Sequence, residues 1–563
     1  MRTNTQGEGL SARMALIRET KASLTRFLTQ GMLRLERMCN RAGQVSLTNS
    51  LRTAIALAAA VLTGCAGAHS TSTNKAADID KLMSTLYERG QFNGAILVAE
   101  QGQIIYRKGF GKANFQTGED FAPETSSDIG SVTKQFTAMA IMILAEHNKV
   151  SYDDPVSNYI PEFSHSAHLR QITLRQLLNH TSGIRDYGDL GIDDSGLDQQ
   201  ALISALLKKQ DLVEKPGVKY RYSNPGYALL AVVVERVPGK RFGEFLDQEI
   251  FKPAGMANTF VYDNPQEKHA PTAVGYGQFG ELDDGGPTAI PGDGGIYSTV
   301  DDLFKWDQAL LTDKIVSQAS LAEAFTPGKV EEGVSKYGFG WNVEEKDGSK
   351  YLWHTGSHAG FRAFIARRLA DRLTVIMLTN RGSSKRQDIN AAIQNILADK
   401  PYSLPKQSGA EKLYKTIHDS GIQAALQLYD ALKNAKSGDY DVGESELNTL
   451  GYQLLYGDQR VGDAIAVFKL NTIEHPASSN AFDSLGEAYA RNGQKDLAIN
   501  SYEMAVKLDP TNGHAASQLT PSQLRKAKLG RALWFAVPAI SAIAVLLVAA
   551  ILVKRKRTRP NSG

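Results

Sequence analysis

The sequence predicts an α/β fold with one antiparallel sheet, followed by a region that is entirely helical. Apolar strand patterns occur at 94–108 and return at 337–379, with helical patterns between them. Short turns join the neighbouring strands, which favours antiparallel pairing. We therefore expect one sheet assembled from the two ends of a single domain. From residue 411 onward the pattern is helical and self-similar.

The individual elements of this domain follow in chain order. Two strands at 94–99 and 103–108 are expected to form a hairpin around Glu100-Gln101-Gly102. A helix is expected from about Ser131 to Glu146, where apolar residues recur at helical spacing. The remaining strands and a closing helix are expected at 337–343, 351–354, 361–367, 373–379 and 388–397.

Length and charge limit the classes of function. The chain has 563 residues, which is more than one hydrophobic core accommodates. Its net charge is +3, but residues 1–64 hold nine Lys/Arg and three Asp/Glu, so the remainder carries −3. We therefore expect no nucleic-acid partner. The only two cysteines, Cys39 and Cys65, provide neither a disulfide framework nor a cysteine metal site.

Both ends of the chain carry targeting signals. Residues 1–64 are predicted to be a leader, because a basic residue precedes the apolar run 54–62, which ends in Leu62-Thr63-Gly64-Cys65. This ending resembles a bacterial lipobox, which implies that Cys65 is lipidated; the alternative is a short buried helix with a chance cysteine. Small polar residues predict a flexible tether over 65–80.

The other signal is an apolar segment near the C-terminus. Residues 532–553 contain no charge and would span ~33 Å as a helix, enough to cross a bilayer. The basic tail 554–563 follows directly, and basic flanks stay cytoplasmic. We therefore expect a bacterial membrane protein whose body faces the periplasm or the outside; a buried core helix is the alternative. Which membrane holds the chain stays open.

The helical region after the predicted linker 401–410 contains internal repeats. Within 411–520, Ala464 and Ala498 are 34 residues apart, as are two aromatic positions and two prolines. This period resembles tetratricopeptide repeats, which often bind a protein partner on a concave surface. Plain helical packing that extends the body is the alternative.

Ser131-Val132-Thr133-Lys134 is the first candidate for catalysis. Residues three apart on a helix share a face, so the lysine amine can reach the serine hydroxyl and activate it as a nucleophile. The same pattern at 72–75 and 403–406 is not followed by an amphipathic helix. A capping serine with a surface lysine is the alternative at Ser131.

Two further motifs carry polar groups suited to the same chemistry. In Tyr222-Ser223-Asn224, Tyr222 is a candidate proton carrier and Asn224 a candidate for holding a substrate amide. The same Tyr-x-Asn pattern recurs at 262–264. In His354-Thr355-Gly356, expected at the end of a strand, Gly356 allows substrate to approach the backbone and Thr355 offers a hydroxyl.

Taken in order, these motifs resemble those of the serine β-lactamase and penicillin-binding-protein superfamily, closest to its class C and DD-peptidase branch. The stretches 172–184 and 292–299 are similar to those that surround the motifs in this family, and the resemblance covers about 81–400. It implies a β-lactamase-like antiparallel sheet flanked by helices, with a helical subdomain, and no cofactor or metal.

The resemblance also implies roles for the site residues. Ser131 would attack a carbonyl, Lys134 and Tyr222 would shuttle protons, and the backbone N–H groups of Ser131 and Ser357 would form the oxyanion hole. The substrate-binding group would be Asn224, His354, Thr355, Gly356 and Ser357. Whether Lys134 or Tyr222 is the base stays open.

We therefore expect a serine hydrolase acting on a small peptide, amide or ester, including D-amino-acid peptides of the cell wall. His354 stands where class C β-lactamases carry lysine, and a mostly neutral imidazole suits a substrate carboxylate less well. A β-lactamase is therefore the weaker enzyme alternative. An inactive receptor or scaffold that binds a protein through its repeats is the alternative from another class.

Overall fold

The computed structural model describes residues 74–191, 197–209, 212–263, 272–286, 290–346 and 348–529. Residue 65, the leader and the apolar segment 532–553 lie outside these ranges. Within them, no helix combines the length and the apolar character needed to cross a bilayer.

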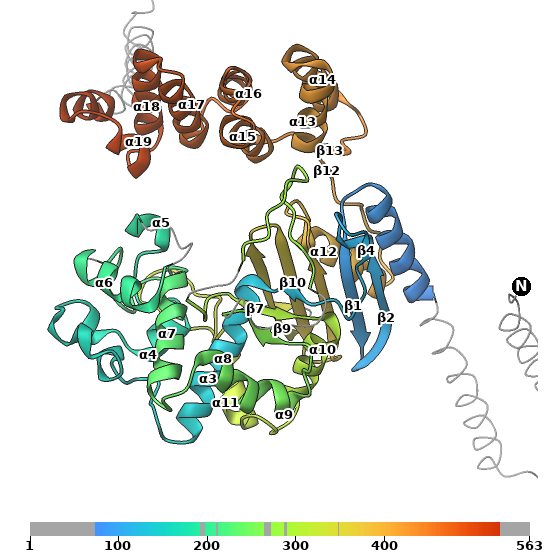
Figure 1. The fold of residues 1–563 in the computed structure, drawn as a ribbon, viewed down its shortest axis with the longest axis vertical. Coiled ribbons are helices and arrows are strands. Elements are labelled where there is room, and N and C mark those ends of the chain that lie inside the picture. Colours follow the sequence, from blue (N-terminus) through green and yellow to red (C-terminus); the bar gives the residue numbers. More distant parts are fainter. Residues whose placement is uncertain are drawn as a thin grey trace, which may run out of the picture. The chain divides into compact units, whose positions relative to one another are not determined.

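A six-stranded antiparallel sheet forms the centre of the first region (Figure 1). Its order is β2-β1-β11-β10-β9-β8, so the two ends of the domain form one sheet, as the sequence predicts, and the N-terminal hairpin pairs with the last strand. The strands are β1 (Gly94–Glu100), β2 (Gln103–Phe110), β8 (Asn342–Lys346), β9 (Ser349–His358), β10 (Phe361–Arg368) and β11 (Leu373–Thr379).

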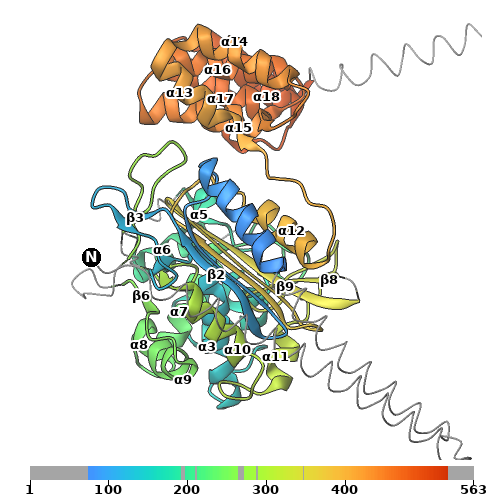
Figure 2. The ribbon, with the colours of Figure 1, turned by 90° about the vertical axis from the view of Figure 1, so that its right-hand side faces the viewer.

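Alternating side chains of this sheet enter two different cores. Ala95 and Leu97 of β1 face the larger core, which contains the helical subdomain. Ile96 and Val98 face the smaller core, built with helix 74–88 and α12 (Arg386–Leu397). Figure 2 shows these two helices together on one face of the sheet. Burial on both faces explains why β1 and β11 consist mostly of apolar residues.

The helices and short strands of the larger core lie between β2 and β8 in the chain. They are β3 (Lys112–Asn114), β4 (Glu119–Asp120), β5 (Ser127–Asp128), η1 (Gly130–Thr133), α3 (Lys134–Glu146), η2 (Val156–Asn158), η3 (Pro161–His165), η4 (Leu169–Gln171), α4 (Leu174–Leu178), α5 (Tyr187–Leu190), α6 (Gln199–Lys209), α7 (Asn224–Arg236), α8 (Phe242–Leu246), η5 (Asp247–Phe251), α9 (Lys252–Ala254), β6 (Phe260–Val261), β7 (Ile296–Ser298), α10 (Val300–Ala309) and α11 (Gln318–Ala324).

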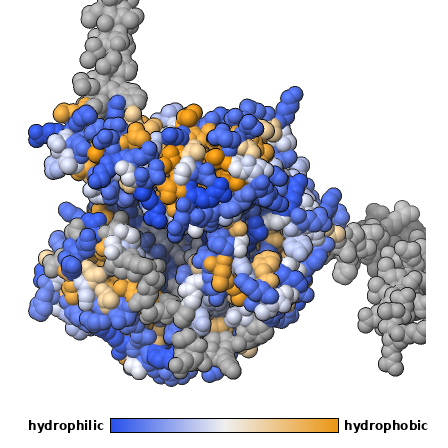
Figure 3. All heavy atoms as spheres, turned by 45° about the horizontal axis from the view of Figure 1, so that its top comes forward, coloured by the Kyte–Doolittle hydropathy of each residue, from blue (hydrophilic) through white to orange (hydrophobic). Residues whose placement is uncertain are grey.

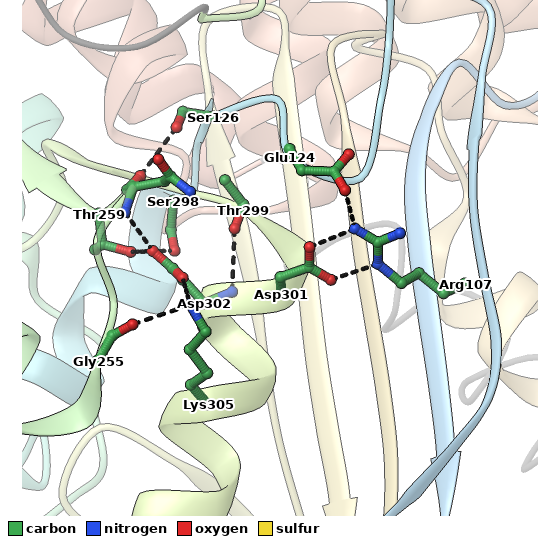
Figure 4. A network of polar contacts seen from close by, with 11 residues as sticks. Arg107, Glu124, Ser126, Gly255, Thr259, Ser298, Thr299, Asp301, Asp302 and Lys305 are labelled. Atoms are coloured by element: carbon green, nitrogen blue, oxygen red, sulfur yellow. Dashed lines mark hydrogen bonds and ion pairs between the residues drawn. The ribbon is translucent and has the colours of Figure 1, made fainter.

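A buried polar network supports the small sheet β5-β7-β6, whose strand β5 leads into the turn η1 that carries Ser131 (Figure 4). Asp302, fully buried near the start of α10, accepts hydrogen bonds from the backbone of Asn258 and from the hydroxyl of Thr259. Thr259 also shares a hydrogen bond with Ser298 of β7. Ser126, just before β5, donates to the Asn258 carbonyl. Because these contacts tie β5 and β7 to α10, they support the start of the turn that carries Ser131.

The second region is helical, as the sequence predicts. Its elements are β12 (Gln407–Ser408), α13 (Gly409–Ser420), α14 (Ile422–Asn434), β13 (Tyr440–Asp441), α15 (Glu444–Tyr452), η6 (Gln453–Gly457), α16 (Val461–Glu474), α17 (Ser479–Arg491), α18 (Lys495–Leu508) and α19 (Gly513–Ser517). Figure 3 shows apolar surface on this region among hydrophilic side chains.

One contact in this region recurs at nearly the repeat spacing. A Cβ on Gly451 would lie 2.4 Å from the Phe468 ring, and a Cβ on Gly486 would lie 2.8 Å from the Tyr502 ring. In each pair, the glycine has no side chain, so the aromatic ring of the next helix can pack directly against the glycine's own helix. Their classification as tetratricopeptide repeats stays a prediction.

Four predicted boundaries are wrong. The linker predicted over 401–410 overlaps β12 and the start of α13, because Ala410 is already buried in the core of the helical region. The tether predicted over 65–80 overlaps helix 74–88, because Ile79 is fully buried against the sheet. The strand predicted at 337–343 begins only at Asn342; Tyr337 precedes it and forms an isolated bridge with Asn342. The helix predicted from Ser131 begins as a 3-10 turn, and α3 starts at Lys134.

Candidate active site

Ser131 lies in the 3-10 turn η1, directly before α3. In a 3-10 helix, residues three apart lie almost directly above one another, so this turn still places Ser131 and Lys134 on one side. The Lys134 Nζ is 3.0 Å from the Ser131 Oγ. Gly130 enters the turn with a φ of +48°, in the left-handed region that favours glycine.

Lys134 is fully buried and has three hydrogen-bond acceptors. Besides Ser131, they are the Asn224 Oδ1 at 2.8 Å and the Asp293 carbonyl at 2.7 Å. An ammonium group has three N–H donors, so this set of acceptors satisfies it completely. The lysine is thereby held in one orientation with one donor aimed at the hydroxyl.

Asn224 is committed to contacts within the protein. Its Oδ1 accepts from Lys134, while its backbone N–H donates to Asp186 at 3.1 Å and its Nδ2 to the same carboxylate at 3.4 Å. The sequence predicts Asn224 as a substrate-binding residue. The structure places its side chain as a link between Asp186 and Lys134, and its role in binding substrate stays a prediction.

Tyr222 packs beside the amine. Its ring centroid is 5.0 Å from the Lys134 Nζ and 4.2 Å from the ring of His180. His180 also holds the backbone on both sides of Tyr222, because its carbonyl accepts from the Arg221 N–H and its Nδ1 from the Ser223 N–H. No hydrogen bond to the Tyr222 hydroxyl occurs within the described part of the chain, which leaves that hydroxyl free for a reacting group.

His354 lies inside β9 rather than at the end of a strand, and only 3% of it is exposed. Burial, together with the charge of Lys134, lowers its pKa to about 3, so the imidazole is neutral near pH 7. Its Nδ1 is 2.6 Å from the Thr355 carbonyl and must carry the proton. Its Nε2 therefore accepts from the Tyr337 hydroxyl at 2.9 Å.

The third motif packs closely against the backbone around η1, which carries Ser131. A Cβ on Gly356 would lie 1.8 Å from the Ile129 carbonyl oxygen, and a Cβ on Gly130 would lie 2.6 Å from the Ser357 backbone nitrogen. Two glycines thus allow β9 and η1 to approach each other. The Ser357 hydroxyl lies 3.2 Å from Arg386, and the Thr355 side chain is half-buried.

The structure therefore brings the predicted residues of all three motifs into one place. Sequence reasoning missed Asp293, Asp186 and Tyr337. A backbone carbonyl such as that of Asp293 has no residue-type signal, although it falls in the stretch 292–299 that resembles the family. Across the described ranges, no group of three metal-ligating side chains occurs.

Comparison with known proteins agrees with this geometry. Residues 79–399 match the Beta-lactamase family. The chain is 32% identical to penicillin-binding protein 4* of Bacillus subtilis over 378 residues, covering 61% of this chain and 80% of the relative. It is 26% identical to a D-aminopeptidase of Brucella anthropi, covering 64% of this chain and 69% of the relative.

Solved structures give the same fold. The octameric penicillin-binding protein homologue from Pyrococcus abyssi has a TM-score of 0.53 at 28% identity, covering 60% of this chain and 82% of that chain. A penicillin-binding protein from Bacillus halodurans has a TM-score of 0.50 at 28% identity, covering 56% and 98%. The chain belongs to the β-lactamase and penicillin-binding-protein superfamily.

Proposed function

We propose that this protein is a serine hydrolase that forms an acyl-enzyme at Ser131 on a peptide, amide or ester. One observation carries the proposal: a fully buried lysine amine is fixed 3.0 Å from the serine hydroxyl by two other acceptors. A serine hydroxyl becomes a good nucleophile only when an adjacent base takes its proton.

The proposed reaction has two halves. The Ser131 Oγ attacks the carbonyl carbon while its proton passes to the base, which is either the unprotonated amine of Lys134 or the phenolate of Tyr222 beside the Lys134 ammonium. The N–H groups of Ser131 and Ser357 hold the oxyanion, and the leaving group departs with a proton from the same relay. Water then attacks the acyl-serine ester, and the released Ser131 regains its proton. Lys134 and Tyr222 both remain candidates for the base.

We propose D-amino-acid peptides and amides as the first substrates to test. The names of two relatives, a penicillin-binding protein and a D-aminopeptidase, support this class. The neutral state of His354 counts against efficient β-lactam hydrolysis, because the residue supplies no positive charge for a substrate carboxylate near pH 7. A β-lactamase is therefore the weaker candidate.

We also propose that the hydrolase acts at a bacterial membrane, on its periplasmic or external side. The support is the sequence alone: the lipobox-like ending at Cys65 and the apolar segment 532–553. We propose that the helical region binds a protein partner, and this proposal is likewise supported only by its repeat pattern in the sequence.

Labelling with a fluorescent fluorophosphonate tests the proposed chemistry. The wild type should be labelled, and Ser131→Ala should not. Ser403→Ala is a matched control, because Ser403 starts another Ser-x-x-Lys pattern but lies exposed in the linker; it should label like the wild type. A folded wild type that resists labelling would instead favour the receptor or scaffold.

If Ser131 is labelled, turnover of a panel of substrates should be measured next. We expect turnover of short esters and of D-amino-acid amides or D-Ala-D-Ala peptides, with slow turnover of a penicillin. A penicillin turned over faster than every peptide and ester would overturn the substrate preference while leaving the acyl-serine mechanism in place.

A further inference from the structure

A buried carboxylate lies three residues before the proposed nucleophile. Asp128 ends β5 and is 1% exposed. Its Oδ1 accepts from the Gly130 backbone N–H at 2.7 Å, and its Oδ2 lies 2.7 Å from the His358 Nδ1. Burying a carboxylate is costly unless it is paired and hydrogen-bonded, so these two contacts fix its position.

The contact between Asp128 and His358 lies next to the place where η1 and β9 pack closely against each other. Ile129 and Gly130 of the turn face Gly356 and Ser357 of the strand across the two near-contacts described above. Asp128 is the residue directly before this packed stretch, and His358 is the residue directly after it. The bridge therefore adds a polar contact between the two segments that flank this close packing.

The separation of these segments matters for the proposed chemistry. The two proposed oxyanion donors, the N–H groups of Ser131 and Ser357, belong to segments that are more than 200 residues apart in the chain. Only noncovalent contacts can hold such donors at the spacing that a developing oxyanion requires. A small misplacement of such groups lowers the rate while leaving substrate binding nearly intact.

We infer that Asp128 and His358 are a positioning pair that fixes the Ser131 turn against β9 and sets the spacing of the oxyanion donors. The inference rests on the proposed acyl-serine function and assigns these residues no contact with substrate. The His358 side chain is 43% exposed, so it can be replaced without opening a core.

Three substitutions separate positioning from simple bulk. His358→Asn keeps an N–H donor near the Nδ1 position, His358→Gln moves the donor further out, and His358→Leu removes it at similar size. In ester turnover, we expect His358→Leu and His358→Gln to lower kcat by about tenfold or more, with KM changed less than about twofold. His358→Asn should restore most of the lost kcat.

The helical region offers a matched control. His514 Nδ1 lies 2.8 Å from the Asp483 Oδ1, and its side chain is 50% exposed, but this pair lies far along the chain from β9. His514→Leu removes the same kind of bridge and should leave both kcat and KM unchanged. An equal loss in His514→Leu would mean that the effect is not specific to the site.

Parallel fluorophosphonate labelling separates failure of this inference from failure of the function. A folded wild type that is not labelled at Ser131 overturns the proposed function. If the wild type is labelled but His358→Leu or His358→Gln keeps the wild-type kcat, only the positioning role is overturned. A loss in His358→Asn as large as in His358→Leu also overturns it. Circular dichroism checks folding; if His358→Leu fails to fold, His358→Gln decides.

Discussion

Lys134 is held by acceptors from three separate parts of the chain. Ser131 lies in its own turn, Asn224 begins α7, and Asp293 belongs to the loop before β7. The amine would otherwise be an uncompensated polar group in the core, and each acceptor offsets that cost. The same contacts orient one donor toward the Ser131 hydroxyl, the proposed nucleophile.

Removing this amine tests its role directly. We expect Lys134→Met, which preserves length and apolar bulk, to reduce kcat/KM for an ester by about a thousandfold, the range typical of a lost acid–base group. Lys149→Met, at an exposed lysine beyond the end of α3, is the control and should react like the wild type. A Lys134→Met enzyme that keeps a tenth of the activity would exclude Lys134 as an essential proton carrier.

Tyr222→Phe separates the two candidate proton carriers. The substitution keeps the ring that packs on His180 and beside Lys134, and removes only the hydroxyl. If Tyr222 protonates the leaving group, kcat should fall about a hundredfold for an amide and much less for an activated ester, whose leaving group needs no proton. Equal losses on both substrates would argue instead for a role in activating Ser131.

The buried histidines predict how stability depends on pH. Burial lowers the pKa of His354 to about 3 and that of His180 well below its ordinary value. Between pH 6.5 and about 3, His354 therefore binds a proton in the unfolded chain but stays neutral in the folded chain. His180 behaves in the same way below pH 6.5. Stability is lost as pH falls through this window, by at most ~1.4 kcal/mol per pH unit for each histidine.

Urea unfolding at pH 7, 6 and 5 measures this effect. His354→Asn should flatten the pH dependence of the unfolding free energy, because one of the two histidines no longer titrates. Above pH 5 the ordinary carboxylates contribute little, so the comparison is specific to histidine. An unchanged slope in the variant would show that His354 is not the group that resists protonation.

At the scale of elements, the site depends on how closely β9 approaches η1. Gly356→Ala would bring a methyl group 1.8 Å from the Ile129 carbonyl, so the strand or the turn must move. We expect loss of nearly all fluorophosphonate labelling together with a lower melting temperature.

Gly462→Ala is the matched control for that substitution. Gly462 lies in α16, and an added Cβ there meets nothing within 4 Å. Because alanine favours a helix over glycine by roughly 0.5–1 kcal/mol, this variant should be unchanged or slightly more stable. Full labelling of a folded Gly356→Ala protein would contradict the importance of the close approach.

At the scale of the whole molecule, the hydrolase region and the helical region have separate buried cores. Separate cores usually unfold as separate units. We expect two calorimetric transitions, of which only the hydrolase transition changes in temperature after labelling at Ser131, since the covalent adduct makes its contacts only in that region. A single transition that shifts as one would mean that the two regions unfold together.

Local sequence patterns were sufficient to predict the sheet and the motifs. Nearly continuous apolar runs identify β1 and β11, because a strand buried on both faces takes mostly apolar side chains. Ser131 and Lys134 are three residues apart, and this separation places them on the same side of either a 3-10 or an α-helical turn. Motif order then identified the family, which the comparisons confirm.

The environment of each site residue was decided only by tertiary structure. No pattern in the sequence indicates that the Asp293 carbonyl turns toward Lys134, that Asn224 is already engaged, or that His354 is buried and neutral. The orientation of a backbone carbonyl and the loss of water around an imidazole depend on segments that are distant in the chain. The sequence alone determined which chemical groups this protein carries, whereas their protonation and partners follow from how those distant segments pack.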